Sequence, residues 1–188
     1  MIYEEVDLSH NSRLIVGLDR ILDTIGYDTS KVEKVLYRNS SVEHAQKRVS
    51  PEVLTLLVEQ GSRDVATEDC NIFKFNNISF DWLGQLLGSS LPVKNISKLG
   101  VSGRIWYPVG GYMGWHTNDD NRGHKLYCTH ARESNKSFFR YRNPESGEIV
   151  TSWDKEGWNF RIFKVAEELL WHCVYSETDR ISIGYTLI

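Results

Sequence analysis

The C-terminal stretch RISIGYTLI, residues 180–188, alternates between apolar and polar or small side chains. Side chains of a β-strand point alternately to opposite faces of the sheet, so one face of this strand is apolar and suited to packing. The other face carries Arg180, Ser182, Gly184 and Thr186. This face either meets solvent or lines the interior of a barrel. In a barrel, Arg180 and Ser182 would clamp an anion, because a guanidinium binds a carboxylate through two hydrogen bonds, and Gly184 would leave room.

Similar short runs, rich in β-branched and aromatic residues, begin at about residue 98. They are GVSGRIWYPVGGYMGWHT, GHKLYCTHA, KSFFRYRN, GEIVTSW, WNFRIFKV and LLWHCVYS, most of them separated by Gly, Asn, Asp, Ser or Pro. NPESGE, residues 143–148, is typical of a hairpin turn. Short strands with regular turn signals predict an antiparallel sandwich or barrel.

The first half of the chain is predicted to be richer in helix. Residues 11–27 place apolar side chains at three- and four-residue steps behind Asn11 or Ser12 as N-cap. Residues 50–62 begin with a Ser-Pro pair suited to a helix start, and residues 78–92 form a third, shorter candidate. We therefore predict one domain over residues 1–188, of α+β class and mainly β. Residues 1–97 would form a helix-rich support region and residues 98–188 the β core.

Composition excludes several classes of function. The 188 residues carry a net charge of -3, which gives no general attraction to nucleic acid or anionic membranes. No apolar run approaches the roughly 18 residues of a membrane-spanning helix. The N-terminus lacks the pattern of a signal peptide. The three cysteines are widely spaced and form no CxxC pair, so a disulfide framework is not expected and a reducing cytoplasm fits best.

Two of the six histidines are candidates for a metal site. We assign no site to the other four: His10, His44, His124 and His130. Taken alone, His172 in the apolar run LLWHCVY predicts a buried, hydrogen-bonded histidine. The combination of residues favours a metal site instead. His116 is followed closely by carboxylates, His172 comes 56 residues later, and Arg180 comes a further 8 residues on.

This combination resembles that of the Fe(II)- and 2-oxoglutarate-dependent oxygenases, in particular their prolyl-hydroxylase-like branch. The matching stretches are YPVGGYMGWHTND (107–119), WHCVYS (171–176) and RIS (180–182). The resemblance extends from about residue 100 to residue 188. It implies a double-stranded β-helix, a jelly-roll barrel, with the metal and 2-oxoglutarate site in residues 98–188.

The resemblance also implies roles for particular residues. His116 and His172 would bind Fe(II) with a third ligand and leave positions for 2-oxoglutarate and dioxygen. Arg180 and Ser182 would hold the remote carboxylate of 2-oxoglutarate, with Tyr107 and Tyr127 as candidates to assist. The enzyme would be a cytoplasmic hydroxylase acting on a C–H bond of a peptide, amino acid or small molecule, with ascorbate as a further cofactor. The primary substrate is not assigned.

The third ligand departs from the family pattern, which has a carboxylate two residues after the first histidine. This chain has Asn118 there. Three arrangements stay open: Asn118 binds the metal, Asp119 reaches it through a β-bulge, or two histidines bind it together with an anion. Residues 118–122 would otherwise be a polar loop.

Asn118 also favours an alternative function, a jelly-roll relative that binds metal or a small acid without hydroxylation. A cupin-like isomerase is a third reading, which the Arg180-x-Ser182 pattern disfavours.

Overall fold

The computed structural model describes residues 3–36, 41–61, 69–75, 81–91, 99–118, 123–165 and 170–187. The helices are α1 (Ser12–Ile25), a short 3-10 turn η1 (Thr29–Lys31), α2 (Val42–Arg48), α3 (Pro51–Glu59) and α4 (Asp81–Ser90). The strands are β1 (Tyr3–Val6), β2 (Val32–Leu36), β3 (Cys70–Phe75), β4 (Leu99–Tyr107), β5 (Gly111–His116), β6 (Gly123–Ala131), β7 (Ser137–Arg142), β8 (Ile149–Trp153), β9 (Gly157–Val165), β10 (His172–Ser176) and β11 (Arg180–Leu187). None of the described helices is long and apolar enough to cross a bilayer.

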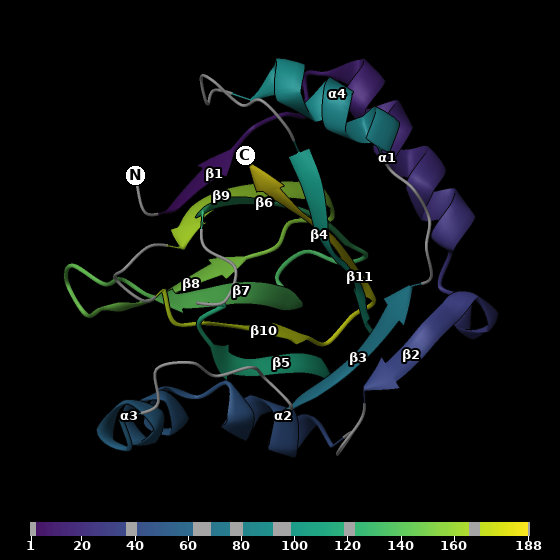
Figure 1. The fold of residues 1–188 in the computed structure, drawn as a ribbon. Helices are drawn as coiled ribbons and strands as arrows, with labels where there is room; N and C mark the ends of the chain where they lie inside the picture. The colour runs from purple at the N-terminus through teal and green to yellow at the C-terminus, as the bar shows by residue number, and fades with distance from the viewer. Residues whose placement is uncertain are drawn as a thin grey trace.

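Strands β4 to β11 form two antiparallel sheets that face each other. The first sheet has the order β9-β6-β11-β4, and the second has the order β5-β10-β7-β8 (Figure 1). The chain passes repeatedly from one sheet to the other, so strands distant in sequence become neighbours. This is the strand order of a jelly roll, and it confirms the predicted double-stranded β-helix and the mainly β class.

Three strands from the first 97 residues extend these sheets. β1 pairs with β9 at the outer edge of the first sheet. β3 pairs with both β4 and β5 and so connects the two sheets along one side, and β2 pairs with β3. The region predicted to be a helical support therefore also supplies strands, none of which was among the predicted elements.

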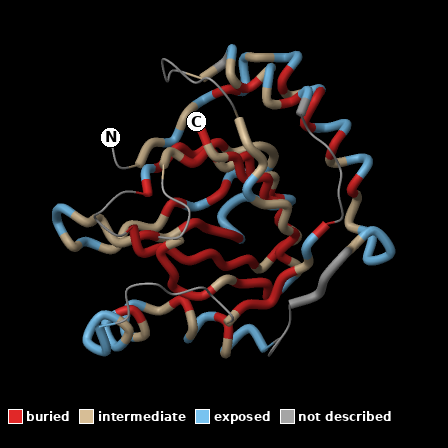
Figure 2. The backbone as a smooth tube through the Cα atoms, in the orientation of Figure 1, coloured by how far each residue is buried: buried red, intermediate tan, exposed pale blue. Residues whose placement is uncertain are grey.

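Helices α1 and α4 cover the outer face of the first sheet (Figure 1). The Asn11 side chain accepts a hydrogen bond from the Leu14 backbone amide and caps α1, as one of the two predicted caps. Ile181, Ile183 and Tyr185 of β11 are fully buried in this cluster. Buried backbone, drawn in red, is concentrated in the sheets, and the helices show alternating buried and exposed stretches (Figure 2). The apolar face of the last strand thus packs against helices, and its polar face turns inward.

Helices α2 and α3 lie against the second sheet. α3 begins at Pro51, as predicted, and Leu54 on its inner side packs into a cluster that includes Trp115 of β5. The indole nitrogen of Trp115 donates to the Ser50 carbonyl at 2.8 Å, which ties the sheet to the start of α3. The outer faces of both sheets are therefore covered, and the space between the sheets holds the site.

Candidate metal and carboxylate site

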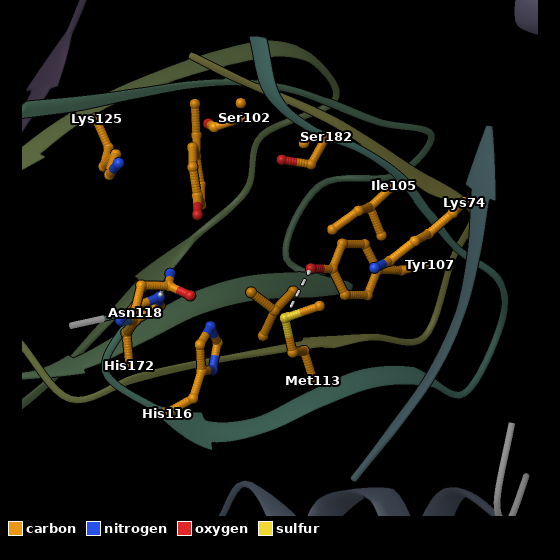
Figure 3. Close-up of a pocket in the computed structure, with 14 residues that line it drawn as sticks. Lys74, Ser102, Ile105, Tyr107, Met113, His116, Asn118, Lys125, His172 and Ser182 are labelled. Carbon is orange, nitrogen blue, oxygen red and sulfur yellow. Dashed lines mark hydrogen bonds between the residues drawn. The ribbon is translucent and has the colours of Figure 1, made fainter. Parts of the chain in front are cut away.

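A cavity of about 240 Å³ opens between the two sheets (Figure 3). It is lined by Lys74, Ser102, Gly103, Ile105, Tyr107, Met113, His116, Asn118, Lys125, Tyr127, His172, Val174, Ser182 and Gly184. The lining residues come from six strands and from the turn after β5. Ser182 and Gly184 on the inner face of β11 are among them, so this face lines an interior and does not meet solvent.

His116 and His172 are neighbours on the wall of this cavity. They are register partners on β5 and β10, and their ring centroids lie 4.1 Å apart. Nδ1 of His116 is 2.8 Å from the Gly114 carbonyl, and Nδ1 of His172 is 2.8 Å from the Leu170 carbonyl. A carbonyl only accepts, so each Nδ1 carries a proton, and in the neutral form of each ring Nε2 keeps a lone pair. Backbone carbonyls orient metal-binding histidines in the same way.

The surroundings of His172 favour its neutral form. Burial lowers the pKa of His172 well below its usual value, and nearby His116 lowers it further, although the hydrogen bond to the Leu170 carbonyl acts in the opposite direction. The rings of Phe139 and Phe163 pack against the imidazole at centroid distances of 5.3 and 5.6 Å. His172 therefore offers a lone pair to a cation at neutral pH.

A β-bulge in β5 brings His116 and Met113 to the same cavity. His172 pairs with His116 and Val174 pairs with Met113, so β5 advances three residues while β10 advances two. An extra residue reverses the facing of the side chains beyond it. Strict alternation along residues 111–117 would place Tyr112, Gly114 and His116 on one face and Met113 and Trp115 on the other, but Tyr112 packs in the outer cluster with Trp115. Trp115 does point away from His116, as the same alternation predicts.

Asn118 lies beside the histidine pair. Its side-chain nitrogen is 3.1 Å from Nε2 of His172, and its amide also hydrogen-bonds to Tyr127. Its backbone φ of 54° is in the left-handed region, which asparagine adopts more readily than most residues. A half-turn about the last side-chain bond would place the amide oxygen, a metal donor, where the nitrogen lies. Asp119, the alternative third ligand, lies outside the described residues.

Arg180 lies behind the cavity wall. Its guanidinium is buried, and Nε donates to Oδ2 of Asp154 at 2.9 Å. Nη2 is 3.4 Å from Oγ1 of Thr129, which is 3.5 Å from Oγ of Ser182. The Thr129 hydroxyl thus connects the guanidinium to Ser182, which lines the cavity. The predicted pair of Arg180 and Ser182 is brought together, with Ser182 as the member that lines the cavity.

Both predicted tyrosines line the cavity. The Arg180 guanidinium lies 5.0 Å from the ring centroid of Tyr107. Burial raises the pKa of Tyr127 to about 12, although Arg180 and the bond to Asn118 act against this rise. Burial also raises the pKa of Tyr107 well above its ordinary value, against the effect of Arg180. Both phenols therefore keep their protons at neutral pH and can donate to an anion.

Two lysines that were not among the predicted site residues line the cavity. Nζ of Lys125 donates to Oγ1 of Thr186 at 2.9 Å, and Lys74 reaches the cavity from β3. Lys125 stands two residues before Tyr127, so alternation along GHKLYCTHA would have placed both on one face. Lys74 offered no such signal, because β3 was not predicted.

The described residues contain no group of three or more His, Cys, Asp or Glu side chains suited to a metal. The donors at the site are instead two imidazoles and one amide. None of the three carries a negative charge, whereas the family pattern includes a carboxylate. Imidazole nitrogens with an oxygen donor and open positions suit Fe(II) among other divalent metals, so the residues fit this ion with less charge compensation than a carboxylate would give.

No protein-family model and no curated protein matches the chain. Several solved structures do. An oxidoreductase of the 2OG-Fe(II) oxygenase family from Burkholderia pseudomallei is 10% identical, with a TM-score of 0.43 over 74% of this chain and 80% of that one. A Pseudomonas putida prolyl-4-hydroxylase is 13% identical, with a TM-score of 0.45 over 91% and 99%. A Trichoplax adhaerens prolyl hydroxylase, in complex with a hypoxia inducible factor peptide fragment, is 15% identical, with a TM-score of 0.43 over 96% and 91%. These likenesses are distant, so the functional proposal rests on the residues of the site.

Proposed function

We propose that the protein is an Fe(II)- and 2-oxoglutarate-dependent oxygenase that hydroxylates a C–H bond of a peptide, amino acid or small molecule. One observation carries this proposal. Two buried histidines, each with Nδ1 on a backbone carbonyl, share a cavity with Ser182, and Thr129 links Ser182 to the buried guanidinium of Arg180. A divalent metal and an acid can therefore occupy one interior space.

In this proposal His116 and His172 hold the metal, and Asn118 contributes its amide oxygen. Bound Fe(II) with 2-oxoglutarate would supply the activation of dioxygen that oxidises a C–H bond. The backbone carbonyls of Gly114 and Leu170 accept from Nδ1 of the two rings, so Nε2 is the atom that each neutral ring would offer to the metal, and they fix the ring orientations. Because the amide is neutral, the affinity for Fe(II) is expected to be lower than with a carboxylate ligand.

The opposite part of the cavity would receive the remote carboxylate of 2-oxoglutarate. The Ser182 hydroxyl lies at the wall, and Nη1 of Arg180 is buried without a hydrogen-bond partner among the described residues. A buried donor without a partner costs free energy that an entering carboxylate would recover. The neutral phenols of Tyr107 and Tyr127 are further donors on the same cavity wall.

Aromatic side chains surround His172. Phe139 and Phe163 are almost fully buried, and both pack against His172. Tyr127 meets Phe163 edge to face at a centroid distance of 4.8 Å. Apolar surroundings lower the effective dielectric constant, which strengthens the electrostatic interactions of a bound ligand. They would also protect the reacting C–H bond from competing reactions.

The proposal is tested by turnover in air with Fe(II), 2-oxoglutarate and ascorbate. We expect the wild-type protein to form succinate, even slowly and without a primary substrate. His172→Ala should abolish succinate formation, and His124→Ala, which changes a histidine outside the cavity lining, should not. Succinate formation that persists in His172→Ala would contradict the assignment of this residue.

A second function is favoured by the amide at position 118, namely binding of a metal or a small acid without hydroxylation. A neutral third donor compensates less of the metal charge than a carboxylate does. The two functions differ in the same assay. Binding of Fe(II) and 2-oxoglutarate without any succinate would favour the second function, and succinate formation would exclude it.

A further inference from the structure

A buried cluster of three charged residues lies behind the carboxylate end of the cavity. Asp154 is fully buried, and its two oxygens meet two different arginines. Oδ1 lies 2.6 Å from Nη1 of Arg161, and Oδ2 lies 2.9 Å from Nε of Arg180. The Ser137 hydroxyl also donates to Oδ2. β9 and β11 of the first sheet are thereby joined to the end of β8 in the second.

The two arginines differ in their spare donors. Nε of Arg161 donates to Tyr3 and Ser152, Nη2 donates to the Ser152 carbonyl, and Nη1 pairs with Asp154. All three nitrogens of Arg161 are therefore engaged. In Arg180, Nε is engaged with Asp154, Nη2 makes a long contact of 3.4 Å to Thr129, and Nη1 has no partner among the described residues. Arg180 is therefore the member of this pair with a guanidinium nitrogen that contacts neither a hydrogen-bond partner nor a carboxylate among the described residues.

The net charge of the cluster also favours binding of an anion. Burial would raise the pKa of Asp154, but Arg180 and Arg161 together lower it to about 2, so the carboxylate is ionised at neutral pH. Two guanidiniums and one carboxylate leave one net positive charge. An isolated pair of Arg180 and Asp154 would be neutral and would attract an anion weakly. The second arginine keeps the cluster cationic.

We propose that Asp154 and Arg161 are positioning residues for carboxylate recognition by Arg180. Asp154 holds Nε, so that the edge formed by Nη1 and Nη2 is left for the ligand beside Thr129 and Ser182. Arg161 offsets the charge of Asp154, so that Arg180 keeps its attraction for the remote carboxylate of 2-oxoglutarate. This proposal rests on the proposed function, because it assumes that 2-oxoglutarate enters the cavity.

The test compares the binding of two acids to protein loaded with Mn(II) in place of Fe(II), measured by calorimetry. The acids are 2-oxoglutarate and 2-oxopentanoate, which shares the 2-oxo acid end but lacks the remote carboxylate. In the wild-type protein 2-oxoglutarate should bind more tightly. In Arg161→Gln we expect this preference to fall about tenfold, equal to about 1.4 kcal/mol. Arg161→Lys keeps the charge and should keep the preference.

A double variant separates charge from packing. Arg161→Gln combined with Asp154→Asn restores one net positive charge, so it should recover part of the preference that Arg161→Gln loses. A merely structural role for Arg161 predicts equal loss for both acids and no recovery.

An unchanged preference in folded Arg161→Gln, or its loss in Arg161→Lys, would overturn the proposal. If Arg161→Gln does not fold, retention of the preference in Arg161→Lys and in the double variant supports the proposal, and its loss in either overturns it. A wild-type protein that binds neither acid would instead contradict the proposed function.

Discussion

The side-chain nitrogen of Asn118 lies 3.1 Å from Nε2 of His172, the nitrogen through which His172 would bind a metal. The amide is thus in reach of a cation held by the two histidines. It brings no charge with it. The metal affinity of the site should therefore respond to the charge at position 118 more than to its shape.

Asn118→Asp tests this expectation with almost no change in size. A carboxylate should tighten Mn(II) binding by about tenfold, because it adds a negative charge beside the cation. Asparagine and aspartate both tolerate the left-handed backbone of residue 118, so the fold should be kept. Calorimetric titration with Mn(II) measures the change. Asn118→Ala is the control and should weaken binding. Unchanged affinity in both variants would show that residue 118 is not a ligand.

Gly184→Ala should narrow the cavity. A Cβ atom at Gly184 would lie 3.0 Å from Oγ of Ser102 and 3.1 Å from a ring carbon of Tyr127, so Tyr127 must move by a few tenths of an ångström. We expect weaker binding of 2-oxoglutarate, because Tyr127 lines the cavity and contacts Asn118. Gly103→Ala is the matched control, because its Cβ would lie 3.9 Å from Ile105 in ordinary contact. Equal affinities in both variants would contradict this account of Gly184.

Arg180→Gln should weaken 2-oxoglutarate binding by about a hundredfold, since one buried charge-assisted hydrogen bond contributes about 1.5–3 kcal/mol. Mn(II) affinity should not change, because Arg180 is not among the residues that line the cavity beside the histidines. Steady-state kinetics would show a higher KM for 2-oxoglutarate with little change in kcat. A loss confined to kcat would contradict the binding role.

Asp154 should make the protein sensitive to acid. Its folded pKa of about 2 lies below the ordinary value of 3.8, so its stabilising contribution is present above pH 4 and is lost as the pH falls from about 4 to about 2. The shift corresponds to about 2 kcal/mol. Asp154→Asn should be less stable at pH 7, because it leaves two guanidiniums without a counter-ion, yet lose less stability between pH 4 and pH 2. Urea unfolding at both pH values tests this. An equal loss in wild type and variant would contradict it.

Much of the barrel could be predicted because strand alternation is a local signal. The polar and apolar faces of residues 180–187 followed directly from the period of two, as did the separation of His116 from Trp115. The same rule misplaced Tyr112 and Met113, because the bulge in β5 is set by pairing with β10 and leaves no clear mark in the sequence.

The partners of Arg180 could not be predicted for a related reason. Asp154 follows β8 of the second sheet, and Arg161 lies on β9 of the first, so they meet Arg180 only after the sheets close on each other. Lys74 was missed because β3 was not recognised as a strand. The histidine pair was predictable because its chemistry is distinctive at a long spacing, whereas an ordinary aspartate or arginine gives no such sign.

The most direct test of the central claim is the visible spectrum of the protein with Fe(II) and 2-oxoglutarate under anaerobic conditions. Chelation of the histidine-bound metal by the 2-oxo acid should give a weak charge-transfer band that appears only when both are present. The band should be absent from His116→Ala and His172→Ala, and in Arg180→Gln it should require a higher 2-oxoglutarate concentration. A wild-type protein that shows no band at saturating Fe(II) and 2-oxoglutarate would contradict the account.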